Sequence, residues 1–209
     1  MDQPSQAIPL KRCAMTGTSG DRIDLDHLIT ADGDVPYAIR RSLRLQLANQ
    51  GDGLDWQRLE LAAAMYVNPI WTERFNNTLP SRVLAQVTSV LMGDSGQAEL
   101  VPQVLELHTL VEEIPSLINS QDGSGLEPYY AVQAALSAAW AAQGEMPVQE
   151  ADSEEEMDPD DIDASYYAAA ALSGGVSWDR PTGNPQIRRE FWRWYLQHIP
   201  PSIARNLGK

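Results

Sequence analysis

Residues 98–118 read AELVPQVLELHTLVEEIPSLI, and this stretch decides the predicted fold. Its apolar residues recur at three- and four-residue spacings, which places them on one face of an α-helix. These residues are Val104, Leu107, Val111, Ile114 and Ile118. The alternation of apolar and polar residues that marks a half-buried β-strand is weak throughout the chain. The sequence therefore predicts an all-α fold.

Similar spacings predict several more helices. We place them at about residues 35–48, 55–67, 80–91, 129–142, 159–173 and 185–199. With 43% hydrophobic residues in a chain of 209, these helices can bury one substantial core. We expect a single domain of six to eight helices over residues 1–209. It would have an N-terminal arm at 1–33 and an acidic linker at 144–157, and 119–126 is the alternative place for a domain boundary.

Local signals predict where several helices begin and end. Asn68-Pro69 should end or kink the second helix, with residues 70–75 continuing on a new axis. Asp158-Pro159 has the form of an N-cap followed by a proline at the first helical position. Gly174-Gly175 can adopt the left-handed conformation that closes a helix. The last helix should stop at Pro200-Pro201.

Nine carboxylates and no Lys or Arg lie between Glu150 and Asp163, in the run EADSEEEMDPDDID. The formal net charge of the whole chain is −14, although residues 180–209 carry 6 basic groups against 1 acidic group. A field of this sign repels nucleic acid and attracts basic proteins at a salt-sensitive rate. A solvated linker is the simpler interpretation of the acidic run, and a partner-binding patch is the alternative. We take the patch to comprise Glu154, Glu155, Glu156, Asp158 and Asp160.

The acids at 158–163 do not form an EF-hand calcium loop. Such a loop needs Gly at its sixth position and Glu at its twelfth, and those positions hold Asp163 and Ala169. Helix capping accounts for Asp158, Asp160 and Asp161 more simply. We therefore expect neither a metal site nor another cofactor.

Residues 188–200, RREFWRWYLQHIP, predict a buried helix. Apolar side chains cover most of the circumference of this helix, as is typical of a helix between packed neighbours. We accordingly place Phe191 and Trp194 in the core rather than against a partner. Arg188, Arg189 and Arg193 are expected to bridge to the run at 150–163, which we call the acidic segment, and to hold the C-terminal region by charge.

Signals of catalysis are sparse. His27, His108 and His198 are the three histidines, and none has a metal-ligand spacing such as H-E-x-x-H. The sequence has no nucleophile elbow, phosphate-binding loop or dinucleotide fingerprint. A hydrolase with paired carboxylates stays open as an alternative, because one sequence does not show which acids meet in space. The prediction is that the chain is not an enzyme.

The compartment is predicted from what the chain lacks. Cys13 is its single cysteine, which excludes an intramolecular disulfide or a cysteine-based metal cluster. The first residues, MDQPSQAIPLKRC, lack the apolar core of a secretory signal. No run approaches the roughly 18 apolar residues of a membrane span. We expect a cytoplasmic protein.

Residues 126–200 resemble the all-helical immunity proteins of bacterial polymorphic-toxin systems. The resemblance is carried by the acidic D-P-D-D-I-D at 158–163, the A-A-A-A-L-S-G-G step at 168–175, Trp178 and R-R-E-F-W-R-W-Y-L at 188–196. It implies a cytoplasmic protein that binds and neutralises a cognate toxin domain and has no activity of its own. The partner is expected to be basic, with no role for nucleic acid or membrane.

Two alternatives belong to other classes of function. A helical interaction module could serve a different partner or associate with itself through exposed aromatic residues. An enzyme with clustered acids could bind a divalent metal tightly, which an inhibitor would not require. Our prediction is an immunity protein whose acidic surface covers a basic cleft of the toxin.

Overall fold

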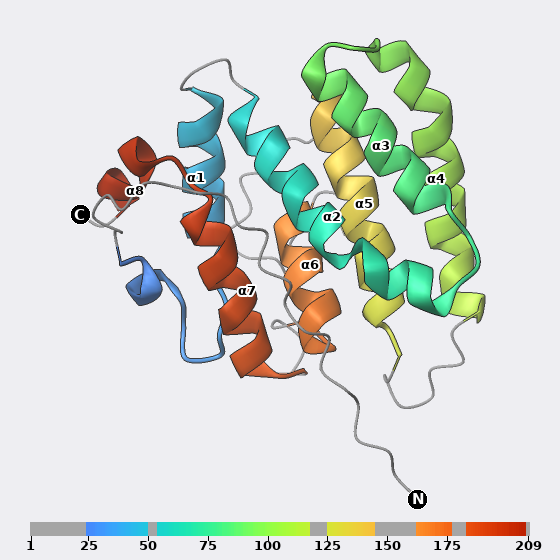
Figure 1. Cartoon of the computed structure of the whole chain (residues 1–209). Helices are drawn as coiled ribbons and strands as arrows, with labels where there is room; N and C mark the ends of the chain where they lie inside the picture. Colours follow the sequence, from blue (N-terminus) through green and yellow to red (C-terminus); the bar gives the residue numbers. More distant parts are fainter. Residues whose placement is uncertain (1–23, 50–53, 118–124, 145–161, 177–182, 208–209) are drawn as a thin grey trace, which may run out of the picture.

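Helix α5 (Glu127–Gln143) is the centre of the fold, because it packs against α2, α3, α4 and α6. The computed structural model describes residues 24–49, 54–117, 125–144, 162–176 and 183–207. Figure 1 shows α3 and α4 on one side of the molecule and α1, α7 and α8 on the other, with α2, α5 and α6 between them. Most of α5 is buried, and many of its residues are Ala, whose small side chain lets neighbouring helices approach closely.

The other elements are arranged around α5 in chain order. A short 3-10 helix, η1 (Asp26–Leu28), precedes α1 (Tyr37–Ala48), α2 (Asp55–Arg74), α3 (Leu79–Met92) and α4 (Gln97–Leu117). After α5 come α6 (Ala164–Ser173), α7 (Pro185–Gln197) and α8 (Pro201–Leu207). The described residues contain eight α-helices and no β-strand, so the prediction of an all-α fold with six to eight helices is confirmed.

One hydrophobic core joins these elements, from Leu25 before η1 to Ala204 in α8. Helices α4 and α5, which flank the alternative boundary at 119–126, pack against each other within it. Of the predicted arm, Leu25, Leu28 and Ile29 are buried in this core, whereas residues 1–23 lie outside the described part of the chain. The described residues therefore form one all-α domain. None of the described helices combines the length and the apolar character that a membrane crossing requires.

Of the two outcomes predicted at Asn68-Pro69, the helix end is wrong, since α2 continues through Pro69 to Arg74, and the kink stays a prediction. Proline removes one backbone hydrogen bond from a helix, but buried side chains on both sides of it hold α2 together. Val67 and Trp71 are almost fully buried, and the Trp71 indole donates to the carbonyl of Asn77 at 2.8 Å. Tertiary packing here outweighs the local signal.

The predicted start of the sixth helix is also wrong. Helix α6 begins at Ala164, later than the predicted start at 159, and its N-cap is Asp163; Asp158 and Pro159 themselves lie outside the described residues. The carboxylate of Asp163 accepts from the amide of Tyr166 at 2.8 Å, which satisfies a free donor of the first turn. The predicted end is confirmed, because Gly174 is the C-cap and has a left-handed backbone with φ of 79°.

The predicted stop before Pro200-Pro201 is confirmed, because α7 ends at Gln197, but a further short helix that the sequence analysis did not predict follows the two prolines. Pro201 starts the short helix α8, a position where a proline loses no intrahelical hydrogen bond. Ile203 and Ala204 are buried, and α8 packs on α1. The preceding helix α7 is buried as predicted: Phe191 and Trp192 are almost inaccessible, and Trp194 packs partly buried against the core.

Candidate functional site

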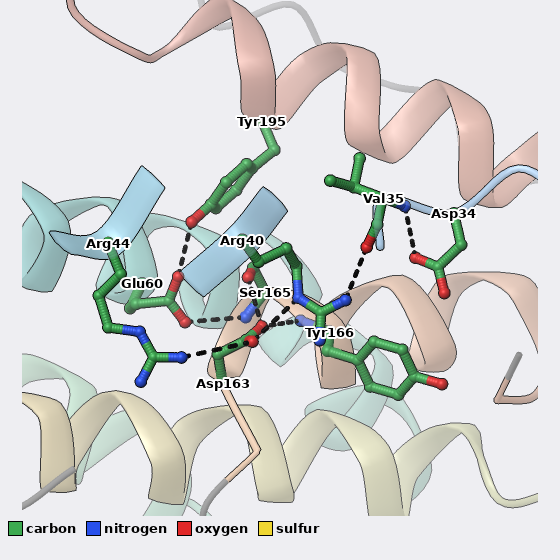
Figure 2. Close-up of polar contacts among 9 residues, drawn as sticks. All are labelled: Asp34, Val35, Arg40, Arg44, Glu60, Asp163, Ser165, Tyr166 and Tyr195. Carbon is green, nitrogen blue, oxygen red and sulfur yellow. Dashed lines mark hydrogen bonds and ion pairs between the residues drawn. The ribbon is translucent and has the colours of Figure 1, made fainter. Parts of the chain in front are cut away.

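The predicted acidic patch lies outside the described structure, and the acidic run at 150–163 reaches it only at its C-terminal end. Glu154, Glu155, Glu156, Asp158 and Asp160 lie outside the described residues. The last acid of the same run, Asp163, is buried with 3% of its surface exposed. It belongs to a buried ion cluster of Arg40, Arg44, Glu60, Asp163 and Tyr195, which Figure 2 shows in close-up.

Asp163 is held by both its oxygens. Oδ2 accepts from Nε of Arg40 at 2.9 Å and lies 3.9 Å from a terminal nitrogen of Arg44. Oδ1 accepts from the hydroxyl of Ser165 at 2.6 Å and from the backbone amide of Tyr166 at 2.8 Å (Figure 2). Burial alone would raise the pKa of Asp163, but the positive charges of Arg40 and Arg44 hold it below its ordinary value. The end of the acidic run is thus locked into the core as an ionised carboxylate.

Arg40 is the cation at the centre of the buried ion cluster. Its NH1 group donates to the carbonyl of Val35 at 2.7 Å, in addition to the bond with Asp163. Its guanidinium carbon lies 4.8 Å from the centre of the Tyr166 ring, a cation–π distance. This one side chain therefore ties α1 to the start of α6 and to the segment that leads into α1.

Glu60 of α2 is the second buried carboxylate of the cluster. Its Oε1 accepts from the hydroxyl of Tyr195 on α7 at 2.7 Å, and its Oε2 accepts from the amide of Ser165 on α6 at 3.0 Å. Burial, and then the negative charge of Asp163, raises the pKa of Glu60 from 4.5 to about 7. Burial also raises the pKa of Tyr195 well above its ordinary value. Glu60 therefore changes its charge near neutral pH while linking three helices.

The pKa of Glu60 predicts an unusual dependence of stability on pH. The folded state binds this proton more tightly than the unfolded state, so the resulting stabilisation is complete below about pH 4.5 and is lost as pH rises through about 7. Between pH 5 and pH 8 the contribution amounts to about 2–3 kcal/mol. We expect Glu60→Gln, which keeps the shape but carries no titrating group, to flatten the pH profile by this amount. Chemical denaturation of both proteins at a series of pH values measures it, and parallel profiles would contradict the assignment.

A small cavity lies within the buried ion cluster. It measures about 10 Å³ and is lined by Arg44, Trp56, Glu60, Asp163 and Tyr195, among others. One water molecule needs about 10–15 Å³ on the same scale, so the cavity has no room for a substrate. Because both carboxylates are also engaged by neighbouring side chains or amides, this pair of acids does not support the hydrolase alternative. Among the described residues, no group of three or more His, Cys, Asp or Glu could hold a metal ion.

The arginines of α7 contact the N-terminal segment rather than the acidic run, as far as the described residues show. Arg193 binds Asp26 with two of its nitrogens, and Nε lies 2.9 Å from Oδ2. Arg189 donates to the carbonyl of Thr30 at 2.8 Å. Arg188, which is 2% exposed, donates to the carbonyl of Gly175 at 2.9 Å and closes the end of α6. These contacts explain how the residues before α1 are held on the fold.

The distribution of charge along the sequence is more uneven than the acidic run alone indicates. No Lys or Arg occurs between Arg82 and Arg180, whereas 18 Asp and Glu residues lie in this interval. The interval includes α4, α5, α6 and the acidic segment. Bases from earlier in the chain pair with some of these acids: Arg40 and Arg44 of α1 lie against Asp163, and Arg82 of α3 lies 3.6 Å from Glu106.

Comparison with known proteins identifies the family. A search of curated proteins found no match to this chain. The family model described as Immunity protein Imm5 matches residues 25–202, which include every described helix except most of α8. The match also spans the buried ion cluster and the acidic segment. The chain therefore belongs to the Imm5 family of immunity proteins.

Proposed function

We propose that this chain neutralises a cognate toxin by binding its toxic domain through an acidic surface that covers a basic cleft. The acids that contribute most are Glu154, Glu155, Glu156, Asp158 and Asp160. The protein acts in the cytoplasm, without a cofactor and without an enzymatic activity of its own. Neither nucleic acid nor membrane takes part in the complex.

The observation that carries this proposal is the family membership together with the long interval that lacks basic residues. Complementary charge raises the rate at which two proteins associate. Added salt screens this attraction and lowers the rate again. An inhibitor that must capture a toxin before it acts benefits from a high association rate. The interval contributes no Lys or Arg of its own beside these acids, so a basic protein can supply the counter-charge.

The described structure supports a surface role for the acidic segment by fixing its two ends. On one side it follows α5, and on the other side it leads into α6, and these two helices pack against each other. At the α6 end the attachment is the buried contact of Asp163 with Arg40.

The function is tested with the toxin domain encoded by the neighbouring reading frame. Its C-terminal region is expressed in bacteria with and without this chain, and growth and co-purification are recorded. We expect growth arrest by the toxin domain alone and relief by a one-to-one complex. A neighbour that stays toxic in the presence of this chain and does not co-purify with it would refute the proposal. A complex in which the chain degrades or modifies its partner would favour the enzyme alternative.

The assignment of the acidic patch is tested by removing its charge. We expect replacement of the three Glu by Gln and the two Asp by Asn to slow association with the toxin domain by about 10-fold or more at low salt. The salt dependence of the association rate should flatten as well, because the screened attraction is gone. Stopped-flow fluorescence at several salt concentrations measures both quantities.

A matched control removes five charges from other exposed acids of the described surface. These are Asp24, Asp32, Glu73, Asp94 and Glu190. Both variants have the same net charge, so a specific patch requires that the control slows association much less. Equal rates in the two variants would mean that the overall charge matters and the patch does not.

A further inference from the structure

Helix α4 lies at the edge of the fold and buries one face only. Its core face comprises Leu100, Val104, Leu107, Val111 and Ile114, each at most 6% exposed. This face packs against α3 and α5 (Figure 1). It includes four of the residues that the periodicity of the sequence predicted.

The outer face of α4 carries an apolar stripe in contact with solvent. Val101 is 44% exposed and Leu105 is 64% exposed, and the two are one helical turn apart. The neighbouring Ala98 and Pro102 are exposed too. Single exposed aliphatic residues are ordinary, but four on one side of a helix form a continuous surface that water solvates poorly.

A line of acids runs beside this apolar stripe. Glu99, Glu106 and Glu113 follow each other at seven-residue steps, so they lie almost straight along the helix axis. Each of the three is exposed. The closest base of the α3–α4 pair is Arg82, whose terminal nitrogen lies 3.6 Å from Glu106 in a pair that is more than half exposed on both sides. Such a pair is screened by solvent and is easily exchanged for a partner's cation.

The charge decides what can cover the outer face of α4. The helix has four Glu and neither Lys nor Arg, so a second copy of this chain would bring one line of acids against another. A basic surface, in contrast, would gain both the apolar contact and the charge pairs. The fitting partner presents an aliphatic or aromatic side chain to Val101 and Leu105 and Lys or Arg to Glu99 and Glu106.

We propose that the outer face of α4 is a docking surface for the toxin, in addition to the acidic segment. This inference rests on the proposed function, because it assumes that the partner is the basic toxin domain. An apolar centre beside charged groups is the usual composition of a specific interface, in which the apolar contact supplies affinity and the charges supply orientation. The two parts of the outer face therefore call for two separate variants.

The test measures binding of the catalytically inactivated toxin domain to the full-length chain. The first variant is Val101→Ser with Leu105→Ser, and the second is Glu99→Lys with Glu106→Lys. The matched controls are Met65→Ser and Glu73→Lys, which make the same kinds of change at exposed positions of α2. We expect the dissociation constant to rise at least about tenfold in both α4 variants and to change less than about twofold in the controls. All the positions are exposed, and unchanged circular dichroism and thermal melting confirm that the variants fold.

The outcomes separate the two proposals. Tight binding by both α4 variants, with weak binding by the variant that lacks the five acids of the segment, would overturn the α4 inference and leave the proposed function standing. A wild-type chain that binds no toxin would overturn both. Sedimentation of the free chain tests whether a second copy of the chain covers this face instead. A dimer that dissociates when Leu105 is replaced by Ser would assign the face to a second copy and overturn the inference. Protection of residues 97–114 from hydrogen exchange in the complex would support it.

Discussion

Replacing Asp163 with Asn should lower the free energy of unfolding by about 3–5 kcal/mol, the loss typical of breaking a buried ion pair. The substitution removes the negative charge between Arg40 and Arg44 and leaves two guanidinium groups in the core without it. Asn is as good an N-cap as Asp, so the loss of stability comes from the missing charge and not from a missing cap at the start of α6. Urea denaturation at pH 6, monitored by tryptophan fluorescence, gives the value.

The control for this prediction is Asp26→Asn, which breaks the ion pair with Arg193 on the surface. That pair is screened by solvent, and its loss should have a much smaller effect than the loss of Asp163. Equal effects of the two substitutions would mean that Asp163 is not the buried partner of Arg40. Since Asp163 also fixes one end of the acidic segment, the variant should protect less well against the toxin at temperatures where it is still folded.

Gly33→Ala should be nearly as damaging, at about 2–5 kcal/mol. Gly33 has φ of 80°, and a side chain in this left-handed conformation costs about 1–2 kcal/mol. A Cβ atom there would also lie 2.1 Å from the carbonyl oxygen of Pro185, where α7 begins. Overpacking of this kind typically costs a further 1–3 kcal/mol. The shift of the denaturation midpoint measures the sum.

Gly93→Ala separates the two contributions. Gly93 has almost the same φ, 79°, but nothing lies within 4 Å of a Cβ atom built there. The free energy of unfolding of Gly93→Ala should fall by the conformational cost alone. The difference between the two variants therefore measures the contact of the N-terminal segment with α7. If the two variants are equally stable, the segment before α1 is not seated against Pro185 as described.

Much of the fold could be predicted because its helices have one apolar face each. The spacing of Val104, Leu107, Val111 and Ile114 is sufficient to place α4, whose observed bounds differ from the prediction by one residue at each end. The errors occur where packing overrides a local signal. Pro69 marks a helix end by its own chemistry, but the burial of Trp71 beyond it keeps α2 helical.

The buried ion cluster could not be predicted, because its members are far apart in the sequence. Arg40 and Asp163 are 123 positions apart, and Glu60 and Tyr195 are 135 apart. A signal was nevertheless present. Arg40 and Arg44 occupy the buried face of α1 together with Leu43 and Leu47, and a charge in that position needs a buried counterion.

The distribution of basic residues along the sequence supports the proposed function more broadly than the acidic run alone. The acidic run is evident from its nine carboxylates. The absence of Lys and Arg from 83 to 179 shows in addition that α4 is acidic and has no basic residue. The seven-residue spacing of the acids in α4 indicates a line on the surface only once it is known which face of the helix is exposed. The α4 docking surface therefore required the structure.

The measurement that tests this account most directly is the association rate constant of the wild-type chain with its inactivated toxin domain, at low and at high salt. We predict a one-to-one complex that forms faster than about 10⁷ M⁻¹s⁻¹ at low salt and at least about tenfold more slowly at 0.5 M salt. A rate that does not depend on salt would contradict the claim that an acidic surface captures a basic toxin.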